Sequence, residues 1–132
     1  MASCLADGQL HARLLRSLSH NSLGAEGAAA LAPALAANGS LTELNIAVNT
    51  IKDEGITVIC NAVQGNKETK LASLDVVHNY ISPVGATAVA AMVAVTGALT
   101  ECDLRFNPRI GEEGEALIRK AWEGKAGFRL HI

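Results

Sequence analysis

The sequence predicts an α/β solenoid of about four strand–helix units, with a parallel sheet on the concave side and helices on the convex side. Three observations predict it: a residue pattern that recurs through the chain, strand-type alternation early in each unit, and helix-type periodicity after it. One such unit cannot bury its apolar strand face alone. Successive units must therefore stack and share one core.

The repeat pattern is clearest in two segments, LTELNIAVNTIKDEG at residues 41–55 and LASLDVVHNYISPVG at residues 71–85. Both fit the spacing LxxLxLxxNxLxxxG position for position. A third copy begins at Leu99, with one extra residue before Ile110, and a partial copy begins at Leu18. These copies define the units of the predicted fold.

One asparagine recurs in each unit, and the four are separated by 28, 30 and 28 residues. An asparagine amide can bond the backbone groups that a tight turn leaves unpaired between neighbouring units. We therefore expect a buried, fully bonded structural ladder of Asn21, Asn49, Asn79 and Asn107. The glycine that follows each asparagine predicts close packing of the helix that begins there, because glycine has no Cβ.

Short strands of about three to five residues are predicted where apolar residues alternate. The alternating pairs are Leu44 and Ile46, Leu74 and Val76, and Cys102 and Leu104. After each asparagine the apolar spacing becomes helical, with Ile56, Ile59, Cys60 and Val63 in one unit and Ala86, Val89, Ala90 and Val93 in the next. Ser82 before Pro83 is a favourable helix start. The last helix is expected from about Gly111 to Trp122, with acids at its start and bases at its end.

We expect residues 1–132 to form a single domain whose two ends cover the sheet. Residues 1–20 are predicted to be an N-terminal cap or a degenerate repeat, and residues 123–132 a C-terminal cap. Phe128, Leu130 and Ile132 alternate, which predicts one last short strand after the final helix.

From about residue 15 to residue 122 the sequence resembles the leucine-rich-repeat family, specifically its ribonuclease-inhibitor-like class with long repeats and convex helices. The two complete copies of the pattern carry this resemblance. Arg13 and Arg16 stand where a first repeat would have framework leucines, so its strand is degenerate or shifted onto Leu14 and Leu15. The same repeat resembles those of ribonuclease inhibitors, Ran GTPase-activating proteins and NOD-like receptors, so it implies the fold without choosing a function.

Composition excludes several classes of function. The 11 basic residues against 13 acidic ones give a net charge of −2, which removes the attraction that nucleic-acid binding requires. The longest uncharged stretch, from Tyr80 to Thr100, is too weakly apolar to span a membrane. Three well-separated cysteines fit a reducing, intracellular and cytoplasmic location. An organelle is the alternative, because the first 20 residues resemble a transit peptide in composition.

Neither catalysis nor a cofactor or metal ion is expected. The sequence indicates no catalytic arrangement of a Ser, a Cys or paired carboxylates around any of the four histidines, His11, His20, His78 and His131. Cys60 and Cys102 take positions of core residues, and neither lies in a CxxC pair. The acids that open the last helix are explained by the positive end of its dipole.

The outward-facing strand positions, with the residues that follow them, are the predicted protein-binding site on the concave face. They are Glu43, Asn45, Asp75, Val77, His78, Glu101, Asp103, Arg105 and Phe106. Acids beside apolar side chains favour a basic partner protein with some hydrophobic anchoring. The alternative is a solvated sheet face that binds nothing.

The convex helices offer a rival surface, rich in alanine and nearly without charge. Its expected residues are Ala29, Ala30, Pro33, Ala36, Ala37, Thr87, Ala88 and Ala91. Such a face predicts burial against another subunit, or else reflects a bias toward alanine as a helix former.

The sequence thus predicts a non-catalytic protein-interaction module, a small subunit or adaptor in a larger assembly. The alternative is a regulator of an enzyme, either an inhibitor or a GTPase-activating type, with Arg105 as the only concave arginine.

Overall fold

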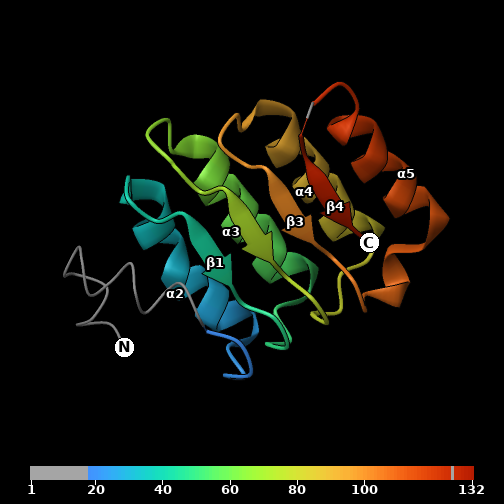
Figure 1. The fold of residues 1–132 in the computed structure, drawn as a ribbon. Helices are drawn as coiled ribbons and strands as arrows, with labels where there is room; N and C mark the ends of the chain where they lie inside the picture. Colours follow the sequence, from blue (N-terminus) through green and yellow to red (C-terminus); the bar gives the residue numbers. More distant parts are fainter. Residues whose placement is uncertain (1–17, 126) are drawn as a thin grey trace.

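The computed structural model describes residues 18–125 and 127–132, which form one parallel sheet backed by one layer of helices (Figure 1). In chain order the elements are α2 (Gly24–Ala37), β1 (Glu43–Asn45), α3 (Lys52–Gly65), β2 (Ser73–Asp75), α4 (Pro83–Val95), β3 (Glu101–Asp103), η2 (Pro108–Ile110), α5 (Gly111–Trp122) and β4 (Arg129–His131). The predicted strand–helix alternation is confirmed. The expectations for residues 1–17, including a first strand, lie outside the described residues.

The four strands lie in chain order, β1-β2-β3-β4, and every neighbouring pair is parallel. Leu44 pairs with Leu74, and Leu74 with Cys102, so equivalent residues of successive units lie side by side. All three side chains point into the core and are at most 1% exposed. The alternation of side chains along a strand therefore turns the flanking residues toward the concave surface.

The helices pack so closely that the recurrent glycines are required. A Cβ built on Gly55 of α3 would lie 2.8 Å from Cβ of Ile51 and 3.1 Å from Cβ of Ala28, which belongs to α2. At Gly85 of α4 the nearest atoms would lie 2.6 to 2.9 Å away. The distances below 3.0 Å are shorter than real Cβ contacts, so a side chain at either glycine would force its neighbours to move.

The core lies between the sheet and the helices, and leucine, isoleucine and valine fill most of it. Cys60 and Cys102 are fully buried within it as free thiols. Burial raises the pKa of the Cys60 thiol to about 12, because an apolar surrounding disfavours the thiolate. Both cysteines therefore act as small apolar side chains, as their positions in the repeat pattern predict.

The asparagines connect each unit to the one before it. The Oδ1 atom of Asn79 accepts hydrogen bonds from the backbone N–H groups of Asn49 (2.9 Å) and Ile51 (3.3 Å). Its Nδ2 donates to the carbonyl oxygen of Ile46 (2.9 Å) in the preceding unit and to that of Val77 (3.2 Å). The amide thus satisfies backbone groups that the turn leaves unpaired.

Asn49 and Asn107 repeat this arrangement and are buried like Asn79. Asn21 differs, because its side chain is exposed. The expectation that all four are buried is wrong at Asn21, which belongs to the first described unit. Among the described residues its side chain bonds only the nearby carbonyl oxygens of Leu18 and Ser19.

Two elements refine the predicted third repeat. The extra residue before Ile110 is accommodated by the short helix η2, which leads directly into α5. After α5, β4 adds to the edge of β3, with Glu101 paired to Arg129. Phe128, Leu130 and Ile132 are half-buried against the core, and the Phe128 ring meets the Trp122 ring edge to face at 5.5 Å. The last strand predicted from their alternation is therefore present.

Candidate protein-binding surfaces

The concave face presents two columns of side chains across the strands. The first column is Glu43, Ser73, Glu101 and Arg129, and the second is Asn45, Asp75, Asp103 and His131. The parallel register brings the predicted concave residues of these columns together on one surface. Ala47 and Val77 follow at the ends of the strands, where Ala47 is buried and Val77 half-buried.

Asp75 and Asp103 are paired across β2 and β3, yet their surroundings differ. Asp103 accepts two hydrogen bonds from the Arg105 guanidinium, at 3.0 Å and 2.7 Å. Burial disfavours the Asp103 charge, but the hydrogen bonds and charge of Arg105 together outweigh it and lower the pKa of Asp103. Among the described residues Asp75 has no such ion pair.

Burial raises the pKa of Asp75, and the Asp103 charge raises it further. The backbone N–H of Val77 donates to its Oδ1 atom (3.1 Å) and opposes this rise without cancelling it. The charge of Arg105 also lowers this pKa, but the net shift is upward. Asp75 is thus a half-buried carboxylate that forms no direct ion pair with another described residue.

A second polar side-chain contact on the concave face was not predicted. His131 Nε2 lies 3.2 Å from Glu101 Oε2, and Arg129 stands in register with Glu101. Arg105 is therefore not the only concave arginine, contrary to the sequence expectation. Sequence reasoning missed this group because it treated Arg129 and His131 as part of a cap rather than as the next members of the two columns.

Phe106 and His78 lie beyond the strands, on the turns that precede Asn107 and Asn79. Both adopt left-handed backbone conformations, with φ of 61° and 52°. Phe106 is 72% exposed. These residues form the rim of the sheet, so Phe106 lies beside the acidic columns rather than within them.

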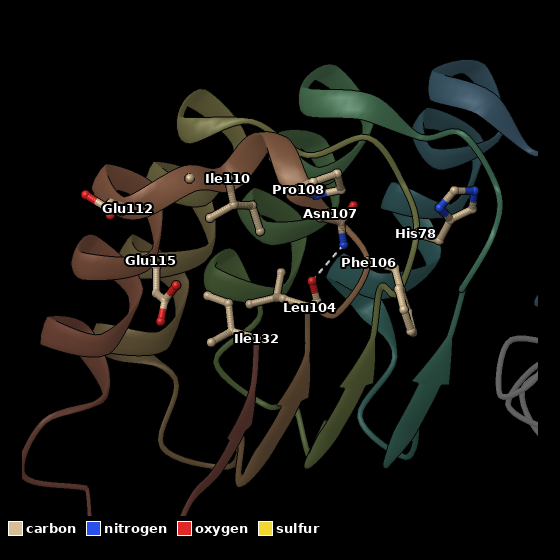
Figure 2. Close-up of a pocket in the computed structure, with 10 residues that line it drawn as sticks. His78, Leu104, Phe106, Asn107, Pro108, Ile110, Glu112, Glu115 and Ile132 are labelled. Carbon is tan, nitrogen blue, oxygen red and sulfur yellow. Dashed lines mark hydrogen bonds between the residues drawn. The ribbon is translucent and has the colours of Figure 1, made fainter.

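A hollow of about 620 Å³ lies next to Phe106, between the end of β3 and the start of α5. Figure 2 shows Leu104, Ile110 and Ile132 converging on it, with Glu115 on the α5 side and Phe106 and His78 beyond Asn107. Its lining is largely apolar. The hollow could accept an apolar side chain next to the concave face.

A second hollow, of about 570 Å³, lies on the loops between strands and helices and is polar. Its lining residues are Thr50, Lys52, Asp53, Tyr80, Ser82 and Arg109. We call it the basic groove, because its two cations, Lys52 and Arg109, outnumber its single carboxylate. Sequence reasoning did not find it, since its residues come from three units and share no motif.

The convex face has the composition that the sequence predicts. Ala29, Ala30, Pro33, Ala36, Ala37, Thr87 and Ala91 are exposed, and Ala88 is half-buried. Val84 and Val95 of α4 are also exposed, at 68% and 62%. The structure thus places an exposed apolar surface on the helices.

The described ranges contain no group of three or more His, Cys, Asp or Glu side chains placed to hold a metal ion. Within them, no helix has the length and apolar character needed to cross a membrane. The rings of His78 and Tyr80 are in contact, with centroids 5.4 Å apart. His20 is likewise a turn residue before its asparagine.

Comparison with known proteins adds three findings. A family model described as Leucine Rich repeat matches residues 15–32, 37–60 and 67–90, together half of the chain. Over 97 residues, 74% of this chain, the sequence is 35% identical to RAN GTPase-activating protein 2 of Arabidopsis thaliana, of which it covers 17%. Over 88 residues, 67% of this chain, it is 31% identical to NACHT, LRR and PYD domains-containing protein 12 of Mus musculus, of which it covers 8%. The chain thus spans less than a fifth of either relative.

Proposed function

Because this chain belongs to the leucine-rich-repeat family, of the ribonuclease-inhibitor-like type, we propose that it is a non-catalytic protein-binding module that acts as a small subunit or adaptor in a larger assembly. The concave face is the proposed contact surface, and its partner is a basic protein segment. The free, buried thiols of Cys60 and Cys102 support the intracellular, cytoplasmic location expected from the sequence.

The carboxylate of Asp75, which is half-buried and in no direct ion pair with a described residue, is the observation that carries this proposal. A half-buried charge without a direct ion pair costs folding free energy. Asp103 next to it keeps its own cation, Arg105, at 2.7 Å. A lysine or arginine of a partner would relieve the cost at Asp75, and Val77 and Phe106 offer apolar contact beside it.

Native mass measurement of the protein from its own cells tests the assembly. A complex heavier than the monomer is expected, and Asp75→Asn should weaken it more at low salt than at high salt, because screening weakens ionic contacts. Glu113→Gln is the matched control, since it removes one exposed charge from α5. Finding only free monomer would contradict the proposal. Loss of the complex on Ala29→Glu or Ala91→Glu, with Asp75→Asn harmless, would move the interface to the convex helices.

The likeness to a RAN GTPase-activating protein favours a second candidate, a regulator of a small GTPase. Such a role needs a group that stabilises transition-state charge or orients the partner's catalytic groups. Arg105 is held by Asp103 at two atoms and would have to leave that pair to act. A GTPase assay over a panel of small GTPases tests it. If the protein accelerates GTP hydrolysis and Arg105→Ala abolishes the acceleration, this function would rank above the first.

A further inference from the structure

The basic groove has a charge pattern that the proposed function does not use. Lys52, at the start of α3, and Arg109, in η2, line it from two different units. Both side chains are exposed, and neither makes an ion pair with another described residue. Two uncommitted cations around one polar hollow attract an anionic group.

Two polar residues that line the groove, Asp53 and Ser82, are already bonded to one another. Asp53 Oδ1 accepts hydrogen bonds from the backbone N–H groups of Ser82 (2.8 Å) and Gly85 (3.0 Å), and Oδ2 accepts one from the Ser82 hydroxyl (2.5 Å). The Val84 N–H donates to Ser82 Oγ (3.3 Å). The first turn of α4 thus has these N–H groups occupied.

This arrangement selects among anions. A phosphate group bound at a helix start uses several backbone N–H groups, and here Asp53 takes that place and would repel a dianion. A side-chain carboxylate needs only the two long cations at the edge of the groove. The anion favoured by the groove is therefore a carboxylate of an acidic protein segment.

One aromatic side chain, that of Tyr80, lines the groove together with the two cations. Tyr80 lines the groove, is 46% exposed and contacts the His78 ring, while Phe106 occupies the rim one unit further on. Their turns are held by the hydrogen bonds of Asn79 and Asn107. Exposed aromatic groups on a fixed backbone lose little entropy on binding, so they suit an apolar residue next to the carboxylate.

Lys52 occupies a position that glycine would fill without strain. Its φ is 57°, and its N–H donates to the Asn79 carbonyl (2.9 Å); in the preceding unit Gly24 has φ of 63° and donates to the Asn49 carbonyl (2.8 Å). A lysine in the left-handed region costs energy that glycine avoids. The cation can thus be removed by Lys52→Gly without harming the fold.

We propose that the basic groove is a docking site for an acidic segment of a partner protein, in which a Glu or Asp beside an apolar residue binds between Lys52 and Arg109 and against Tyr80. This goes beyond the proposed function, because the groove lies on the loops and its charge is opposite to that of the concave face. Loss of binding at one of these surfaces is therefore expected to leave binding at the other intact.

Nuclear magnetic resonance titration with short synthetic peptides tests the proposal. The probes are a peptide of glutamates around two leucines, the same peptide with lysines, a phosphoserine version and a short single-stranded RNA. The glutamate peptide should shift the amide signals of Lys52, Tyr80 and Arg109. Lys52→Gly and Arg109→Ala should each lower the affinity for the glutamate peptide about fivefold, which is the upper range for the loss of an exposed ion pair.

The controls separate this site from the concave face and from a folding defect. Lys67→Glu changes an exposed lysine after α3 and should leave binding intact, as should Asp75→Asn. Lys52→Gly should keep or raise the melting temperature. The proposal is overturned if the glutamate peptide causes no shifts at millimolar concentration, if Lys52→Glu binds it as well as the unchanged protein, or if the lysine, phosphoserine or RNA probe binds more tightly.

Discussion

Asp53 of α3 binds the start of the next helix, α4, through Ser82. Its carboxylate accepts the Ser82 hydroxyl at 2.5 Å and the Ser82 backbone N–H at 2.8 Å. Ser82 is itself the N-cap of α4 and accepts from Val84. One unit therefore provides the negative charge that stabilises the positive helix end of the following unit.

Asp53→Ala is expected to lower the free energy of unfolding by about 2 kcal/mol, because it leaves donors at the helix start without an acceptor. Urea denaturation measures the loss. Asp53→Asn should cost less, since its amide oxygen can still accept. Glu54→Ala changes the neighbouring exposed acid, and its free energy of unfolding should stay within about 0.5 kcal/mol of that of the unchanged protein. Equal losses for Asp53→Ala and Glu54→Ala would show that the contact does not stabilise the protein.

Asn79→Ala is expected to lower the free energy of unfolding by about 3 kcal/mol, because it removes a buried amide that bonds backbone groups in two units. Asn21→Ala should cost less than about 1 kcal/mol, since Asn21 is exposed. Chemical denaturation of both variants under one set of conditions gives the comparison. A similar cost at both positions would contradict the energetic importance of the buried ladder.

The two paired aspartates predict opposite dependence on pH. Burial raises the pKa of Asp75 above its usual 3.8, so the folded state holds this proton more tightly than the unfolded chain does. Its contribution to stability is present below 3.8 and is lost as pH rises through the folded pKa. Asp103 has a lowered pKa, so its contribution is present above 3.8 and is lost as pH falls through the folded pKa.

Asp75→Asn should therefore raise stability at pH 7 by up to about 1 kcal/mol while keeping an acceptor for Val77, and Asp103→Asn should lower it by a similar amount. The difference for Asp75→Asn should shrink as pH falls through the raised folded pKa of Asp75, whereas that for Asp103→Asn should persist to lower pH, because the folded pKa of Asp103 is lowered. Thermal unfolding from pH 3 to pH 8 checks the signs. The same sign at both positions would refute this account.

Deleting residues 126–132 removes β4 and tests its proposed role as a C-terminal cap. The melting temperature should fall by about 10 °C or more, because Phe128, Leu130 and Ile132 cover the core beside β3. Arg129→Ala is the matched control, since it changes an exposed residue of the same strand and should leave the melting curve nearly unchanged. An unaltered curve after the deletion would show that the segment is not a cap.

The fold was predictable because its determinants recur at equal spacing. Leu44, Leu74 and Cys102 stand at equivalent positions of the repeat, and the structure pairs them side by side. The extra residue near Ile110 was visible as a break in spacing. Its conformation as η2 was not, because a single insertion can form a bulge, a turn or a short helix.

The surfaces were predictable only where they follow the strand register. That Asp75 neighbours Asp103 follows from the repeat, but the ion pair of Asp103 with Arg105 depends on side-chain conformations that no spacing encodes. The role of Asp53 was missed for the same reason, since its partners lie about 30 residues away without any shared motif. Arg129 was missed because the last strand was interpreted as a cover rather than as a further row of the concave face.

The hydrogen bonds of the asparagines also determine the order in which the units can be completed during synthesis. The turn at Asn49 is closed by the amide oxygen of Asn79, which lies 30 residues later in the chain, and the turn at Asn79 by that of Asn107, 28 residues later. A ribosome releases the chain from its N-terminus, so each turn must wait for the following unit to emerge. During synthesis, the most recently released unit is therefore always incomplete, and its predecessor becomes complete only when the next asparagine arrives.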